Sequence, residues 1–218
     1  MHSGLTVEAT ILAESAIAAV GEAAQRLDPS FHTIPDKLFS ELSSTENSQG
    51  LISLVRLPTH EWDSVLRNSE RVVILDGVQD PGNAGAIVRS AEAFGVDGIV
   101  FGRGTASPTN PKTLRASAGS LFRIPFVKAG PVDLVLDSLQ SVNLPLYAAT
   151  AHDGDPLSQV DLSRAAIVIG SEAHGVSQEY LQAARAIHVP VRGVESLNAA
   201  AAAAVILYAA AEQQKKRQ

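Results

Sequence analysis

The 218-residue chain contains no cysteine, which excludes disulfide bonds, thiolate zinc sites and cysteine nucleophiles. It also lacks a basic N-terminal stretch followed by an apolar one, so no secretory signal is predicted. The longest apolar run, residues 199–211, is rich in alanine and too short to span a bilayer. These absences predict a cytoplasmic protein with no membrane partner.

Charged residues are also scarce, at 18% against 45% hydrophobic residues, which predicts a packed core rather than disorder. The net charge of −6 is unfavourable for a nucleic-acid partner. The basic residues are unevenly distributed, however, and a local basic patch on an acidic body stays open. Five of them fall within one stretch, at Arg89, Arg103, Lys112, Arg115 and Arg123. No His, Asp and Glu cluster has the spacing of metal ligands, so no metal is expected.

Residues 70–218 alternate between strand and helix patterns, without internal repeats or a low-complexity linker. Strands are predicted at 71–76, 98–101, 144–149, 165–169 and 187–189, and helices at 84–94, 111–118, 132–139 and 196–213. This alternation, with apolar strands, predicts an α/β fold with a parallel sheet covered on both faces. Residues 1–65 differ. There, strands at 6–12 and 51–57 and a helix at 36–42 predict a small separate α/β domain, joined through residues 58–68.

Three glycine-containing loops follow strands in the second region. Because ligands in open α/β sheets bind at the carboxyl ends of the strands, the loops predict one composite site. The first loop contains Asn83 and leads into a helix in which Arg89 lies one turn after Gly85. Glycines let a backbone approach a ligand closely, and Arg89 is spaced to point toward it, although a solvated arginine is the simpler alternative. The loop is not GxGxxG, so a dinucleotide site is poorly supported.

The second loop contains Gly170, Glu172 and His174, and the third runs from Val189 to an alanine-rich helix with Ser196 as a plausible N-cap. Considered without the other loops, Glu172 is most simply interpreted as a loop carboxylate that caps the following helix, and His174 as a solvated turn residue. The small residues of the last helix indicate close packing, either within the chain or at a dimer interface.

Together, the segments PGNAGAIVRSAEAFG, IVIGSEAHGVS and VPVRGVESLNAAAAAAVILY resemble the three signature motifs of the SpoU/TrmH family of RNA 2'-O-ribose methyltransferases. They occur in the family order, and the resemblance covers about residues 70–213. Residues 115–125 also resemble a family segment. The resemblance implies the SPOUT fold, a parallel α/β domain with a C-terminal trefoil knot. It also implies a homodimer whose interface lies beside the cofactor, S-adenosylmethionine. The residue pattern alone would not predict a knot, because knots are rare.

The resemblance also implies roles for individual residues. Cofactor contacts fall on Gly170, Val189 and Leu197, with Thr150, Ala151 and Val191 near the adenine and ribose. It assigns catalysis or substrate positioning to Asn83, Arg89, Glu172 and Asn198. It assigns RNA contacts to Arg89, Arg115 and Arg123. Because a guanidinium stays protonated, we expect Arg89 to grip a phosphate and stabilise the developing ribose oxyanion, oriented by Glu172. His174 is a weaker alternative as proton acceptor.

The sequence departs from the family pattern at a few positions. Ala200 replaces a serine that is frequent in the family, and Ala209 replaces a glutamate. Residues 1–65 resemble only part of the family's small RNA-binding domain, which predicts a truncated one. The expected function is methyl transfer to a ribose 2'-hydroxyl of rRNA or tRNA. The alternatives are a non-catalytic RNA-binding paralogue and a doubly wound nucleotide-binding enzyme.

Overall fold

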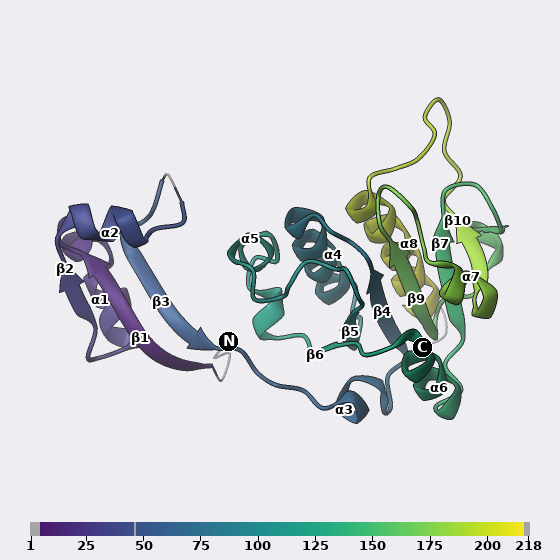
Figure 1. The fold of residues 1–218 in the computed structure, drawn as a ribbon, viewed down its shortest axis with the longest axis horizontal. Helices are drawn as coiled ribbons and strands as arrows, with labels where there is room; N and C mark the ends of the chain where they lie inside the picture. The colour runs from purple at the N-terminus through teal and green to yellow at the C-terminus, as the bar shows by residue number, and fades with distance from the viewer. Residues whose placement is uncertain (1–4, 46, 216–218) are drawn as a thin grey trace. The chain divides into compact units, whose positions relative to one another are not determined.

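A computed structural model describes residues 5–45 and 47–215 of the chain. The chain divides into two compact units, Met1–Pro58 and Thr59–Gln218 (Figure 1). The division lies before the predicted boundary at 65–70, because helix α3 (Trp62–Leu66) buries Val65 and Leu66 in the core of the second unit. Among the described residues, no helix is long and apolar enough to cross a bilayer.

The first unit is a small mixed α/β domain, as predicted. Strand β1 (Thr6–Ala13) lies between β2 (His32–Ile34), which is parallel to it, and β3 (Leu51–Arg56), which is antiparallel. A 3-10 turn η1 (Glu14–Ala16) and the helices α1 (Ile17–Leu27) and α2 (Asp36–Leu42) pack with this sheet. Helix α1 was not predicted, since no side chain caps its N-terminus and the sequence gives no start signal.

The second unit contains a seven-stranded sheet in the order β6-β5-β4-β9-β7-β10-β8, and every pairing in it is parallel. The predicted parallel α/β fold is therefore confirmed. The strands are β4 (Arg71–Asp76), β5 (Gly98–Phe101), β6 (Phe126–Lys128), β7 (Leu146–Thr150), β8 (Asp155–Pro156), β9 (Ala165–Gly170) and β10 (Arg185–His188). All of β9 and most of β4 are buried, which matches their continuous apolar sequences. The trefoil knot stays a prediction of the family resemblance.

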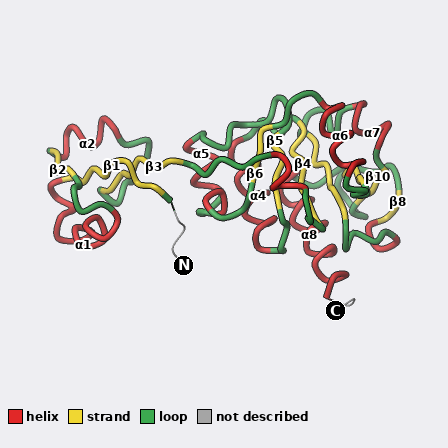
Figure 2. The backbone as a smooth tube through the Cα atoms, turned by 90° about the horizontal axis from the view of Figure 1, so that it is seen from below, coloured by secondary structure: helices red, strands yellow, loops and turns green. Residues whose placement is uncertain are grey.

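Helices lie on both sides of this sheet (Figure 2). They are α4 (Pro81–Ala93), α5 (Pro111–Ala116), α6 (Val132–Ser141), α7 (Gln178–Ala183) and α8 (Ala199–Lys215), with 3-10 turns η2 (Ser120–Phe122) and η3 (Leu157–Gln159). Alternate strand residues such as Ile74 and Val168 form one core with Val135 and Leu139 of α6 and Tyr180 of α7. Helix α4 packs against both α5 and α8.

Helix α4 begins earlier than predicted and helix α8 begins later, because of the residues that cap their N-termini. Helix α4 begins at Pro81 rather than 84, because Asp80 accepts a hydrogen bond from the Asn83 N–H and proline is favoured at the first helical position. Helix α8 begins at Ala199 rather than 196, because Asn198 and not Ser196 accepts hydrogen bonds from the free N–H groups of the first turn.

Gly85 serves helix packing rather than the predicted approach to a ligand. A Cβ at this position would lie 2.4 Å from the carbonyl oxygen of Thr113 and 2.6 Å from Cβ of Ala116. Both residues belong to α5, so the glycine lets the axes of α4 and α5 come close together. This contact fixes the position of α4, and of the loop before it, relative to α5.

Candidate functional site

Three loops at the carboxyl ends of β7, β9 and β10 enclose a cavity of about 180 Å³ together with the start of α8. The cavity brings together every residue that the sequence predicted as a cofactor contact, namely Thr150, Ala151, Gly170, Val189, Val191 and Leu197. Glu172 also lines it. Ligand binding at the carboxyl ends of parallel strands is the usual arrangement in α/β sheets.

The loop after β9 folds back on its own backbone beside the cavity. Ser171 and Gly175 exchange two backbone hydrogen bonds, of 3.0 and 2.9 Å. A Cβ on Gly170 would lie 2.1 Å from the carbonyl carbon of Gly175, so only glycine fits at this position. The Ser177 N–H donates to Asp76 Oδ2 over 2.7 Å and ties the far end of the loop to β4. The wall of the cavity here is therefore main chain held in one conformation.

Asn83, Glu172 and Asn198 form one hydrogen-bonded group that joins the three glycine-containing loops. The Asn83 side-chain amide donates to Glu172 Oε1, and Asn83 Oδ1 accepts from Asn198 Nδ2 over 3.1 Å. Asn198 Oδ1 in turn accepts from the N–H groups of Ala200 and Ala201 at the start of α8. Both ends of each amide are used, which fixes the orientation of the two side chains.

Asp80 holds the first of these loops. Its carboxylate accepts from the Asn83 N–H over 2.9 Å and from Lys112 Nζ over 3.3 Å. The hydrogen bond from the Asn83 backbone, followed by the one from Lys112, lowers the pKa of Asp80 below its usual value. Lys112 belongs to α5, so this ion pair adds to the contact between α4 and α5.

Arg89 lies on α4 with an exposed side chain, and no hydrogen bond or ion pair holds it within the described ranges 5–45 and 47–215. In this structure Glu172 accepts from Asn83 and makes no hydrogen bond with Arg89, so the orientation of Arg89 by Glu172 stays a prediction. His174 is exposed, and its backbone N–H donates to Ser171 Oγ.

The two other predicted RNA contacts differ from each other. Arg123 donates to both carboxylate oxygens of Glu92, over 2.6 and 2.8 Å, and this pairing lowers the pKa of Glu92. Arg115 lies exposed on α5, and it is not without an interaction partner. The Arg123 guanidinium is thus engaged, in contrast to that of Arg89. No group of His, Cys, Asp or Glu that could hold a metal ion occurs among the described residues.

Several residues of the site were not singled out from the sequence. Ser171, Ala199, Ala202 and Ile206 line the cavity, and Asp80 positions Asn83. These lining residues lie within the second and third motif segments, but the sequence does not say which side chains face the cavity. Asp80 could have been found, since Asp followed by Pro is a strong start signal for a helix.

A family model described as the SpoU rRNA methylase family matches residues 70–208. The 23S rRNA (guanosine(2553)-2'-O)-methyltransferase RlmP of Bacillus subtilis is 34% identical over 172 residues, which cover 78% of this chain and 67% of that protein. The 23S rRNA (uridine(2479)-2'-O)-methyltransferase of Streptomyces viridochromogenes is 30% identical over 175 residues, which cover 76% of this chain and 61% of that protein. The aligned region thus spans about two thirds of these relatives.

The fold is similar to that of a solved structure, the SpoU methyltransferase AviRb from Streptomyces viridochromogenes in complex with the cofactor AdoMet. The TM-score is 0.86 at 27% identity, and the match covers 98% of this chain and 85% of AviRb. The match therefore includes both units. Together with the family model, it confirms the family that was predicted from three ordered segments. The chain belongs to the SpoU rRNA methylase family of RNA 2'-O-methyltransferases.

Proposed function

We propose that this chain transfers a methyl group from S-adenosylmethionine to a ribose 2'-hydroxyl of rRNA or tRNA. The observation that carries the proposal is the hydrogen-bonded group of Asn83, Glu172 and Asn198 beside the cavity. It joins the three motif loops at one point. A reaction between a bound donor and an RNA hydroxyl needs such a fixed meeting point, because positioning is a large part of the rate enhancement.

The chemistry of the cavity lining suits S-adenosylmethionine. Main chain around Gly170 and small side chains such as Ala199 and Ala202 form its wall, while Val189 and Leu197 supply apolar contacts. Thr150 at the end of β7 also lines it, with Ala151 and Val191 from the loops after β7 and β10. When bound, S-adenosylmethionine supplies an electrophilic sulfonium methyl group.

Arg89 binds the RNA at the reacting ribose in this proposal. Its free guanidinium pairs with the phosphate beside the target nucleotide and stabilises negative charge that develops on the ribose oxygen. Because a guanidinium keeps its proton, the proton of the 2'-hydroxyl leaves to solvent water rather than to Arg89. Asn83 and Asn198 hold the loops around the nucleotide, and Glu172 holds Asn83.

The test is methyl transfer from labelled S-adenosylmethionine to unmodified ribosomal and transfer RNA by Arg89→Ala. Loss of a group that stabilises the transition state lowers the rate by about 100-fold or more, while donor binding measured by calorimetry stays unchanged. Arg89→Lys is the matched control, since it keeps the charge but loses the two-pronged contact and retains part of the activity. Wild-type turnover by Arg89→Ala would refute the role.

The proposed partners are RNA and a second copy of the chain. An apolar stripe on α8, with Ala201, Val205 and Tyr208 exposed at helical spacing, provides a face for a homodimer. Val205 and Tyr208 are 42% and 54% exposed. Ala202 and Ile206 of the same helix line the cavity. A dimer formed through this face would therefore have its interface beside the cofactor, as the resemblance implies. A cytoplasmic location stays part of the proposal.

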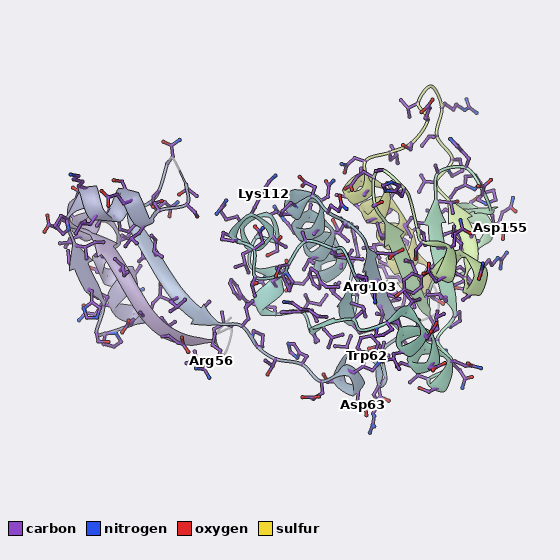
Figure 3. All side chains as sticks on the ribbon, viewed as in Figure 1. Arg56, Trp62, Asp63, Arg103, Lys112 and Asp155 are labelled. Atoms are coloured by element: carbon purple, nitrogen blue, oxygen red, sulfur yellow. The ribbon has the colours of Figure 1, made fainter. Side chains whose placement is uncertain are left out.

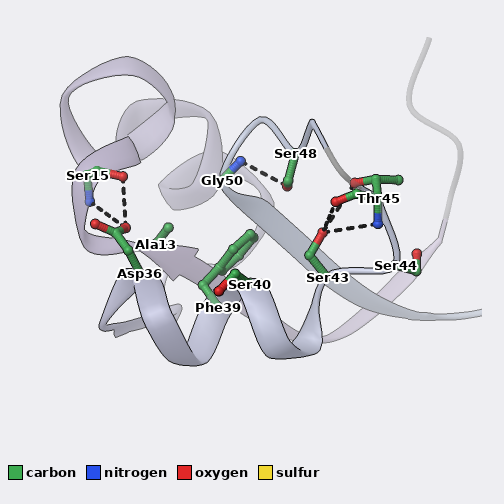
Figure 4. Close-up of a pocket in the computed structure, with 10 residues that line it drawn as sticks. All are labelled: Ala13, Ser15, Asp36, Phe39, Ser40, Ser43, Ser44, Thr45, Ser48 and Gly50. Carbon is green, nitrogen blue, oxygen red and sulfur yellow. Dashed lines mark hydrogen bonds between the residues drawn. The ribbon is translucent and has the colours of Figure 1, made fainter.

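The first unit is proposed as a substrate-binding domain. It contains a hollow of about 720 Å³ between the end of β1, helix α2 and the loop that follows it (Figure 4). Most of its lining residues carry hydroxyl groups, namely Ser15, Ser40, Ser43, Ser44, Thr45 and Ser48. Hydroxyls both donate and accept hydrogen bonds, as contacts to bases and riboses require. Arg115 and Arg123 are further candidate RNA contacts.

A further inference from the structure

Two basic side chains without partners lie at the carboxyl edge of the sheet, on the half opposite the cavity. Arg103 follows β5, and Lys128 is the last residue of β6. Both are exposed, and neither makes a hydrogen bond or ion pair within the part of the chain that the structure describes. We call this pair the basic edge. The cavity, in contrast, lies at the ends of β9, β7 and β10.

The loop that carries Arg103 is tightly held against β4. The Gly102 N–H and the Thr105 hydroxyl both donate to the Leu75 carbonyl, each over 2.8 Å, and the Ala106 N–H donates to the Val78 carbonyl over 2.9 Å. A Cβ on Gly102 would lie 2.5 Å from that Leu75 oxygen, so the close approach requires glycine. Arg103 therefore projects from a rigid support.

The same loop adjoins the first motif loop. A Cβ on Gly104 would lie 3.6 Å from the Cα of Gly77, and a Cβ on Gly77 would lie 3.8 Å from the Cβ of Ser171, which lines the cavity. The loop of Arg103 thus lies close to the first motif loop, which in turn lies close to Ser171 of the cavity. Arg103 is among the side chains labelled in Figure 3.

Lys128 lies directly beside this loop in the sheet. It pairs in register with Phe101, the last residue of β5, and the Ala129 N–H donates to the Phe101 carbonyl over 2.8 Å. The loops after β5 and β6 contain no acidic residue between 102 and 131. Two other cations between these strands are engaged instead, since Lys112 of α5 pairs with Asp80, and Arg123, which follows η2, pairs with Glu92.

We propose that the RNA backbone crosses the carboxyl edge of the sheet over β4, β5 and β6, with phosphates bound by Arg103 and Lys128. The proposal rests on the proposed function and adds the path of the substrate. On a chain with net charge −6, attraction of a polyanion must be local, and free cations on a rigid support provide it. The bound RNA would then run from the basic edge toward Arg89 and the cavity.

The experiment measures the binding of a short single-stranded RNA of mixed sequence by fluorescence anisotropy over a series of KCl concentrations. Each phosphate contact contributes about 0.7 to the slope of log Kd against log salt for a single strand. Arg103→Gln and Lys128→Gln are each expected to reduce the slope by about 0.7, and the double variant by about 1.4. Donor binding and thermal stability stay unchanged, because both side chains are exposed and unpaired.

Arg67→Gln is the matched control. It makes the same change in net charge, but Arg67 precedes β4 at the amino edge of the sheet, where it pairs with Asp63. Its salt slope should equal that of the wild type. Steady-state methyl transfer adds a second measurement, in which Arg103→Gln raises KM for RNA and leaves kcat unchanged.

The outcomes separate this inference from the proposed function. If the wild type methylates RNA but the double variant keeps the wild-type slope and KM, the path is wrong and the proposed function stands. An equal loss of slope in Arg67→Gln would also overturn the path, since net charge alone would explain it. A wild type that binds RNA through the basic edge but transfers no methyl group supports the path and contradicts the proposed function.

Discussion

At the scale of single residues, Asn83 illustrates why side-chain identity matters more than polarity. Its amide donates to the Glu172 carboxylate and its oxygen accepts from Asn198. The side-chain amide does both because it carries a donor and an acceptor on one planar group, whereas an aspartate in its place is acceptor-only when ionised. The family resemblance assigns a role to each of these residues, but the sequence could not show that Glu172 pairs with Asn83 rather than Arg89, since 89 positions separate the two partners.

Replacement of Asn83 by Asp should therefore be more harmful than its small change in shape suggests. Asn83→Asp places a second carboxylate against Glu172, and two adjacent carboxylates repel until one of them takes up a proton. We expect methyl transfer to fall by about tenfold or more at neutral pH and to recover partly as the pH is lowered. The measurement is the rate of methyl transfer between pH 6 and 8, compared with the wild-type profile.

The double variant Asn83→Asp/Glu172→Gln is the control, because its second substitution supplies a side-chain amide that donates to the new carboxylate and reverses the direction of the hydrogen bond. Its activity should exceed that of Asn83→Asp alone, with a flatter pH profile. Equal activity of the single and double variants would show that the contact between positions 83 and 172 does not position the loop.

At the scale of elements, helix α4 follows the loop after β4 that carries Asn83, and Asp80 is the N-cap of this helix. The pKa of Asp80 is lowered in the folded state, so its ionised form stabilises the fold. This contribution is fully present above the unfolded pKa of about 3.9 and is lost as the pH falls through the lower folded pKa.

Asp80→Asn removes the charge but keeps a good N-cap. We expect the variant to be less stable than the wild type at pH 7 by less than about 1 kcal/mol, because the ion pair with Lys112 is exposed. The difference should shrink as the pH is lowered below the unfolded pKa of about 3.9, and it should disappear only below the lower folded pKa, where Asp80 of the wild type is protonated. Urea unfolding over a series of pH values from 7 downward measures it, and a difference that is constant with pH would exclude the charge as its cause.

Elements with a strong signal were predicted well, and those without one were missed. Strands β4 and β9 are continuous apolar runs, and their predicted bounds differ from the observed ones by at most one residue. Strands β6 and β8 and helix α7 were missed, because they are three, two and six residues long and show no periodicity over so few positions. Their existence depends on contacts with neighbours that are distant in sequence.

At the scale of the whole second unit, the two halves of the carboxyl edge of the sheet differ in character: one carries the cavity and the other carries exposed basic residues. The small-walled cavity lies over β9, β7 and β10, and the basic edge over β5 and β6, with β4 and its motif loop between them. The sequence predicted a single site from three loops, and the strand order adds that the basic edge lies on the other side of β4 from the cavity. This order could not be predicted, because β9 inserts between β4 and β7.

The proposed homodimer gives the last prediction at this scale. Tyr208 is half-exposed on α8, and its ring packs edge-on against Phe94 of the same chain with centroids 5.7 Å apart. The ring is thus held in place while much of its apolar surface faces outward. Tyr208→Glu removes that surface and places a charge in the interface, which should raise the dimer dissociation constant by at least about tenfold.

Tyr208→Phe is the matched variant, since it keeps the ring and its contact with Phe94 and should remain dimeric. Light scattering coupled to size exclusion gives the oligomeric state, and circular dichroism checks that the charged variant keeps its helices. Because Ala202 and Ile206 of the same helix line the cavity, loss of the dimer should also weaken the binding of S-adenosylmethionine. A folded Tyr208→Glu protein that remains dimeric at wild-type affinity would place the interface on another face.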